Sequence, residues 1–181
     1  CRELGAIAPL LKCLEPPAEG EADRNVLRMS TWTLSNLCCE LSAARQLRQS
    51  PSGFLPLIEL LGRSGDPELQ RPAANCLFNV TTSDLGAPVA IENTGGLPAL
   101  SNILLYAEGL AFDEDDTRMQ ELLSCVGGIL LNCAAKKGLP ALMMAQQPEM
   151  LDRLLTCVRP NDYVPQVSNA AREPPHGAPL P

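Results

Sequence analysis

The chain has 181 residues, of which 45% are hydrophobic but only 3% aromatic, and its formal net charge is −7. This length suffices for one domain whose core must be largely aliphatic, a composition that suits helix-on-helix packing better than a β-sandwich. The acidic balance argues against nucleic acid and anionic membranes as partners, and no apolar run predicts a membrane-spanning helix or a signal peptide.

The first predicted repeat unit is a partial one, residues 1–41. The segment that begins at Gly5 is typical of a helix start, because glycine ends a preceding helix and a proline in the first turn opens the next. Residues 24–41 are predicted as a long helix that carries the sequence Trp-Thr-Leu-Ser-Asn-Leu at 32–37. An acidic insertion at 15–21 separates the two helices.

The second predicted unit, residues 42–82, contains three helices. A short helix at 42–49 is followed by a medium one that Gly53 and a proline introduce. The long helix at 67–82 follows without an insertion. Asp66 directly precedes its first residue, a proline, and is therefore predicted to be its N-cap.

The third predicted unit, residues 85–135, repeats this order. A short helix at 85–93 precedes a medium helix that starts at Gly96. An acidic insertion at 107–116 then leads to a long helix at 117–135. Insertions confined to one connection are what a solenoid tolerates, because that loop projects from one edge of the stack.

A further partial unit is predicted at residues 138–158. The register assigns a short helix to 138–146 and a medium helix to 148–158. The Pro-rich residues 159–181 are expected to be either an incomplete repeat or a disordered tail.

The three long helices align on one pattern, in which a leucine is followed two residues later by an asparagine. Asn36 and Asn79 are 43 residues apart, within the range of about 40–47 for two- or three-helix solenoid repeats. Asn132 lies 53 residues after Asn79 because of the insertion before the third long helix. Upstream apolar or small residues recur at steps of three or four, which is one helix face. The predicted core stripes are Val26, Ser30, Leu34 and Leu37; Leu69, Ala73, Leu77 and Val80; and Leu122, Val126, Leu130 and Cys133.

In this pattern residues 1–158 resemble the armadillo repeat, and the segment from Trp32 to Cys38 is especially similar to importin-α. The resemblance implies an all-α fold, a right-handed α-solenoid of three-helix repeats whose long helices line a concave groove. It also implies that an asparagine on each long helix clamps the main chain of an extended peptide, and that a tryptophan one turn earlier walls a slot for a lysine or arginine stem.

The resemblance places Asn36, Asn79 and Asn132 at the clamping position and Trp32 at the tryptophan position, where the other repeats have Asn75 and Gly128. An amide both donates and accepts hydrogen bonds, so it can pair with a peptide bond, and an indole face attracts cations by about 0.5–2 kcal/mol. The predicted peptide-binding residues are Trp32, Asn36, Asn75, Asn79, Asn132, Arg28 and Arg71.

Simpler interpretations of these residues stay open. The asparagines could bond to neighbouring carbonyls and hold the repeats together. Trp32 could be a core residue, although it lies off the predicted core stripe, which favours exposure. The sequence at Asn79 is also a glycosylation motif, which we discount because it lies within an amphipathic helix. The acidic run from Asp113 to Asp116 is expected to be a solvated loop rather than an attractor of basic peptide.

The sequence offers no catalytic or metal-binding pattern. Its eight cysteines include no Cys-x-x-Cys pair, and the one histidine, His176, lies in the Pro-rich tail. We interpret most cysteines as reduced core residues of a cytoplasmic or nuclear protein, with disulfides as the alternative. No glycine-rich phosphate loop is present. We therefore expect no enzyme activity, cofactor, metal or small-molecule substrate.

The function that this resemblance implies is non-catalytic protein binding. In the version nearest to importin-α, the chain is a nuclear import adaptor that recognises basic localisation signals in the cytoplasm or nucleus. The alternative is a general armadillo scaffold in signalling, in the cytoskeleton or in substrate recruitment by a ubiquitin ligase, with a non-basic partner.

Overall fold

A computed structural model describes residues 5–15, 23–63, 66–106 and 117–135 of the chain, and these form helices and turns with no strand among them. The helices of this part are α1 (Ile7–Lys12), α2 (Arg24–Leu37), α3 (Leu41–Gln49), α4 (Leu55–Arg63), α5 (Pro67–Ser83), α6 (Ala87–Asn93), α7 (Gly96–Tyr106) and α8 (Thr117–Ala134). The predicted all-α class is confirmed. The insertions at 15–21 and 107–116, apart from residue 15, and the predicted unit at 138–158 and tail at 159–181 lie outside the described residues.

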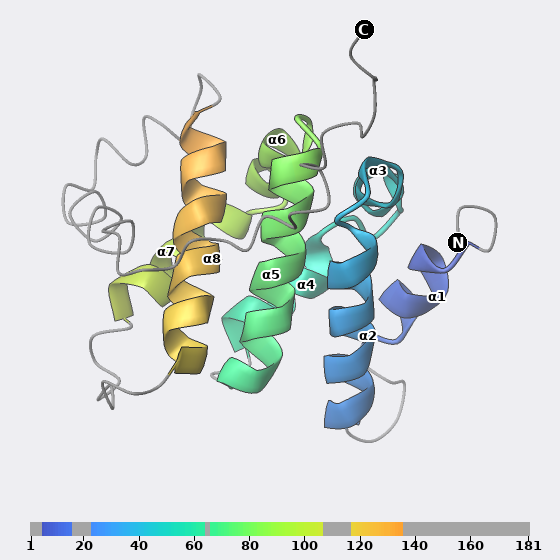
Figure 1. Ribbon diagram of the computed structural model, residues 1–181, viewed down its shortest axis with the longest axis horizontal. Coiled ribbons are helices and arrows are strands. Elements are labelled where there is room, and N and C mark those ends of the chain that lie inside the picture. The colour runs from blue at the N-terminus through green and yellow to red at the C-terminus, as the bar shows by residue number, and fades with distance from the viewer. Residues whose placement is uncertain (1–4, 16–22, 64–65, 107–116, 136–181) are drawn as a thin grey trace, which may run out of the picture.

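The three long helices stand side by side in one layer, with α5 packed between α2 and α8 (Figure 1). The medium helices α1, α4 and α7 each pack against the long helix that follows them in the chain. The short helices α3 and α6 lie near one end of α5 (Figure 1). The helices follow one another in the predicted order, but their lengths do not rise from short to medium, because α3 and α4 each have nine residues and α1 has only six. No helix in the described part of the chain is long and apolar enough to cross a membrane.

Aspartates begin two of the long helices. The Asp23 carboxylate accepts hydrogen bonds from the backbone N–H groups of Asn25 and Val26, at 2.8 and 3.3 Å. The Asp66 carboxylate accepts one from the backbone N–H of Glu68 at 3.0 Å. Each bond satisfies an N–H that lacks a partner in the first helical turn. The predicted cap at Asp66 is confirmed, whereas the cap at Asp23 was not predicted.

Glycines with a positive φ precede the medium helices, at Gly5 (56°), Gly53 (51°) and Gly95 (72°). This left-handed conformation is accessible to glycine at little cost. In the third unit the glycine with this conformation is Gly95, so the sequence alignment on Gly96 is one residue off. Gly96 has a different role, since a Cβ there would lie 2.8 Å from Ile91 and 2.9 Å from Ile58 side-chain carbons. A residue without a side chain is needed at position 96 because α6 and α4 pack directly against its backbone.

The predicted core stripes form the centre of one contiguous core. Leu34, Leu77 and Leu130, which occupy the same repeat position, are at most 1% exposed. The other predicted core residues are buried as well, except for two residues of α2. Leu37 is only half-buried, and the prediction for Val26 is wrong, because its side chain is 45% exposed. Val26 lies in the first turn of α2, and the six-residue α1 is shorter than the helices that cover α5 and α8.

Six cysteines lie in the described residues, and all six are free thiols. Cys38, Cys76 and Cys133 are buried in the core, and Cys125 is partly buried. Cys38 and Cys39 are adjacent, yet only Cys38 points inward. These four core cysteines act as small apolar side chains, as the sequence indicates.

Candidate functional site

The predicted site residues all lie on the long helices. Arg28, Trp32 and Asn36 follow one another at single-turn spacing along α2, and Arg71, Asn75 and Asn79 do the same along α5. Asn132 is on α8. Asn36 is exposed, and the other six side chains are half-buried. α2, α5 and α8 are neighbouring helices in one layer, so the seven residues are distributed over three adjacent helices (Figure 1). We call these seven residues the long-helix surface.

Two asparagines of this surface bond to the preceding long helix. The Asn79 Nδ2 donates to the Ser35 carbonyl oxygen at 3.0 Å and to its Oγ at 3.3 Å. The Asn132 Nδ2 donates to Thr81 Oγ1 at 3.1 Å and to Thr82 Oγ1 at 3.4 Å. Both amides thus join adjacent helices, as the simpler interpretation of the asparagine row expected, although the acceptors belong to helices rather than loops. Their part in peptide binding stays a prediction.

Asn36 differs from its two equivalents. Its side chain is exposed and makes no hydrogen bond with the described residues. Asn75, one turn before Asn79, likewise makes none and is half-buried. An amide with both its donor and its acceptor open can pair with a peptide N–H and C=O at once. Asn36 therefore has the full hydrogen-bonding capacity that the clamping role needs.

The Trp32 ring is covered by an arginine of the next long helix. The Arg71 guanidinium carbon lies 5.4 Å from the ring centroid, within the range of a cation–π interaction. The Arg71 Nη1 also donates to Glu121 Oε2 at 2.8 Å, so Trp32, Arg71 and Glu121 connect α2, α5 and α8. Trp32 is neither a core residue nor a freely exposed one.

The third repeat has no room for an aromatic side chain at the tryptophan position. A Cβ on Gly128 would lie 2.5 Å from Cε2 and 2.8 Å from Cδ2 of Phe78, which belongs to α5. The Phe78 ring therefore occupies the space that a side chain at position 128 would need. A larger side chain at position 128 would therefore require Phe78 to move.

Ion pairs flank the surface at the first turns of the long helices. Arg24 of α2 pairs with Asp66 at 2.5 Å, and Arg118 of α8 pairs with Glu68 at 2.8 Å. Both arginine side chains are more than 60% exposed, whereas their carboxylate partners Asp66 and Glu68 are 23% and 27% exposed. Arg28, one turn before Trp32, forms no ion pair with the described residues. The surface thus combines balanced charge pairs with one extra arginine.

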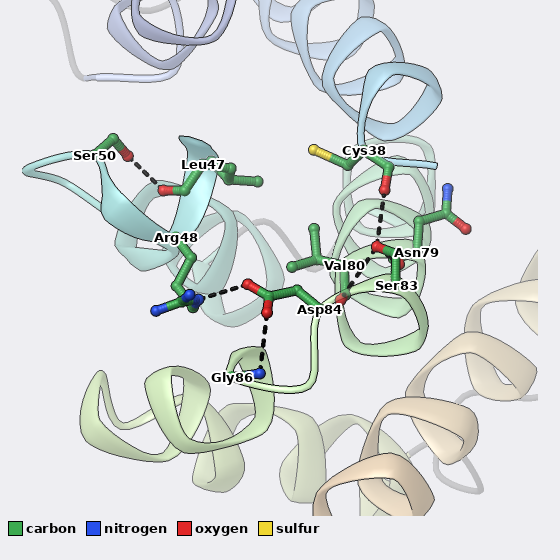
Figure 2. Close-up of polar contacts among 9 residues, drawn as sticks. All are labelled: Cys38, Leu47, Arg48, Ser50, Asn79, Val80, Ser83, Asp84 and Gly86. Atoms are coloured by element: carbon green, nitrogen blue, oxygen red, sulfur yellow. Dashed lines mark hydrogen bonds and ion pairs between the residues drawn. The ribbon is translucent and has the colours of Figure 1, made fainter. Parts of the chain in front are cut away.

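A second polar cluster closes the other end of α5 (Figure 2). The Asp84 carboxylate accepts from Arg48 Nε at 2.6 Å and from the backbone N–H of Gly86 at 3.1 Å. The Ser83 hydroxyl donates to the Asn79 carbonyl oxygen at 2.7 Å and lies 3.3 Å from that of Cys38. Burial would raise the pKa of Asp84, but these hydrogen bonds and the charge of Arg48 outweigh it and hold the pKa below its usual value.

The thiols of this region are poor nucleophiles. The hydrogen bond that the Cys76 thiol makes with Cys38, together with burial, raises the pKa of Cys76. Burial raises the pKa of Cys125 to about 11 and that of Cys133 to about 12, with smaller contributions from nearby carboxylates. Thiols this far above neutral pH stay protonated and unreactive. Within the described residues no three histidine, cysteine or acidic side chains are grouped so as to hold a metal ion.

Some of these contacts could not be found from the sequence. Glu121, Ser35 and Thr81 have no motif, and their partners lie 50, 44 and 51 residues away along the chain. The hydroxyl acceptors also occupy different positions of the repeat, so periodicity does not reveal them. The rotation of one long helix against the next decides which side chains meet, and only the structure gives that rotation.

Comparison with known proteins bears on the first repeat. Residues 1–39, which contain α1 and α2 with Trp32 and Asn36, match the model of the armadillo/beta-catenin-like repeat. No curated protein matches the chain. Armadillo repeats are generally non-catalytic scaffolds that bind proteins. The match therefore supports the armadillo-repeat family for this chain and indicates a protein-binding scaffold.

Proposed function

We propose that this chain is a non-catalytic scaffold that holds an extended peptide segment of a partner protein on the long-helix surface. In this proposal the repeats continue as a right-handed α-solenoid, and the long helices line its concave side. The armadillo match of residues 1–39 and the layer formed by α2, α5 and α8 support it. No cofactor, nucleic acid, membrane or small-molecule substrate enters the proposal.

The observation that carries this proposal is the hydrogen bonding of Asn36, Asn79 and Asn132, which we call the asparagine row. Asn79 and Asn132 use their amide N–H groups to bond the preceding helix, and their amide oxygens have no partner among the described residues. Asn36 has both its donor and its acceptor open. A row of amide oxygens can accept hydrogen bonds from the N–H groups of an extended chain with little regard to its side chains. Stacking of the repeats and peptide binding can therefore use the same residues.

Two kinds of guest fit this scaffold. A basic localisation signal, and with it a nuclear import role in the cytoplasm and nucleus, is favoured by Trp32 and Asn36, which lie one turn apart on α2. A non-basic partner, as in signalling, the cytoskeleton or recruitment to a ubiquitin ligase, is favoured by Arg71, which already covers the Trp32 ring. The peptide-binding proposal holds for both.

Calorimetric titration with extended peptides of equal length tests the proposal. One peptide is rich in lysine and arginine, one in glutamate, and one is neutral. We expect at least one of them to bind and Asn36→Ala to weaken its binding. Asn102→Ala, an exposed asparagine of α7 outside the long-helix surface, is the matched control and should change nothing. If Asn36→Ala and Asn102→Ala behave alike, the asparagine row does not bind the guest.

A further inference from the structure

We propose that the Arg71 side chain covers the Trp32 ring and thereby disfavours binding of lysine and arginine side chains of a guest peptide to the long-helix surface. This inference rests on the peptide-binding function proposed above. It concerns one side chain of α5, which lies where a lysine or arginine of a guest would otherwise stack.

The geometry shows what such a guest would have to displace. The Arg71 guanidinium carbon is 5.4 Å from the Trp32 ring centroid, and its Nη1 is 2.8 Å from Glu121 Oε2. A cationic side chain of a guest would have to compete with Arg71 for the face of the Trp32 ring. It would also be repelled by the positive charge of Arg71. A neutral or acidic guest side chain has no such competitor.

The hydrogen bonding of Arg71 also indicates that stacking on Trp32 helps to fix the position of its side chain. Its Nε is buried and has no hydrogen-bond partner among the residues that the structure describes. An unsatisfied buried donor costs free energy, so the pose is kept by other contacts, namely the indole face and the Glu121 carboxylate. The Arg71 side chain is 21% exposed, whereas that of Glu121 is 50% exposed. The Glu121 end of the ion pair is therefore open to screening by solvent.

The third repeat provides an independent parallel. At the position equivalent to Trp32, Gly128 is covered by Phe78, which is also a residue of α5. The same helix thus supplies a side chain to the tryptophan position on each of its two sides, Arg71 over α2 and Phe78 over α8. Of the three positions equivalent to Trp32, the first and the third are thus covered by a side chain of α5, and the second holds Asn75.

Trp32 is the only tryptophan, so its fluorescence reports on this place alone. Quenching by caesium, a cation, is compared with quenching by neutral acrylamide in the native chain, in Arg71→Met and in Arg118→Met. Methionine keeps an unbranched apolar side chain over the ring but carries no charge. We expect Arg71→Met to raise caesium quenching relative to acrylamide, and Arg118→Met, which removes an exposed arginine paired with Glu68, to leave it unchanged.

Peptide affinity gives the second measurement. Arg71→Met is expected to tighten binding of the Lys/Arg-rich peptide about tenfold, as expected from the strength of a cation–π contact, and to change the neutral peptide little. If caesium quenching does not rise, or if the basic peptide binds the native chain as tightly as Arg71→Met, the inference is overturned. If quenching rises but no peptide binds either protein, Arg71 is the occupant of the ring and the proposed peptide-binding function fails.

Discussion

α5 and α2 carry asparagine at the same position of the repeat, yet the two side chains have different surroundings. Asn79 of α5 bonds to Ser35 of the neighbouring long helix, whereas Asn36 of α2 is exposed. α5 has a described long helix on each side, and α2 has one on one side only. The repeat position therefore determines where an asparagine points, and the neighbouring helix determines what it does there.

The same contrast holds at the ends of these two helices. α5 ends at Asp84, which is 4% exposed and bonded to Arg48 and Gly86. The residue 43 positions earlier is Leu41, which is 40% exposed and is the first residue of α3. The polar contacts of Asp84, which hold the end of α5 against α3 and α6, have no counterpart at Leu41. If the surroundings of a residue rather than its repeat position determine its contribution to stability, substitutions at equivalent positions should change the free energy of unfolding by different amounts.

The largest effect is expected where the two helices are alike. Leu34 and Leu77 are both 0% exposed, so Leu34→Ala and Leu77→Ala should each lower the free energy of unfolding by about 2–5 kcal/mol. Urea unfolding followed by circular dichroism measures this. Leu131→Ala, at a site 41% exposed on α8, is the control and should cost much less. A small effect at Leu34 alone would mean that α2 is only loosely attached to the core.

The next effect should separate the two helix ends. Asp84→Asn removes the charge that Arg48 Nε bonds at 2.6 Å and should lower the free energy of unfolding by about 1.5–3 kcal/mol at neutral pH. Leu41→Asn, at the residue 43 positions earlier, is expected to change the free energy of unfolding by no more than about 0.5 kcal/mol. An equal loss at both positions would show that Arg48 and Asp84 contribute little.

The same pair predicts a dependence on pH. The pKa of Asp84 is lower in the folded protein than its ordinary value of 3.8, so the folded state binds fewer protons than the unfolded chain as the pH falls. The stabilisation from Asp84 is complete above that ordinary value and is lost as the pH falls through the folded-state pKa. The difference in melting temperature between the native chain and Asp84→Asn should therefore be full at pH 6 and should shrink in strong acid.

A smaller effect is expected at the asparagines themselves. Asn79→Ala removes the bonds to Ser35 and should lower the free energy of unfolding by about 0.5–1.5 kcal/mol. Asn36→Ala removes no hydrogen bond among the described residues and should be nearly neutral. Denaturant unfolding of the two variants side by side measures the difference. If Asn36→Ala were as costly as Asn79→Ala, the contrast between α2 and α5 would not hold.

The sequence predicted the fold better than it predicted the site. Leucines and small residues at steps of three and four can bury only one face of a helix, so Leu34, Leu77 and Leu130 identified the core. Asp66 before a proline likewise predicted a helix start. The contacts of Trp32 could not be predicted, because they depend on a long arginine from another repeat. Glycine at position 128 signalled that the pattern fails there, but not that Phe78 fills the space.

The smallest effect concerns the ion pairs at the first turns. Arg24 pairs with Asp66 and Arg118 with Glu68, so α5 is bonded to both of its neighbours at this end. The arginine side chains are 62% and 61% exposed, so the two pairs should be equally screened by salt. Arg24→Gln and Arg118→Gln are each expected to cost about 0.2–1 kcal/mol at low salt and nearly nothing at about 1 M salt. Urea unfolding at both salt concentrations measures this. Equal losses in the free energy of unfolding would mean that the difference between α2 and α5 comes from the asparagines and Asp84. A larger loss for Arg24→Gln would show that the packing of α2 against α5 depends on the Arg24–Asp66 ion pair.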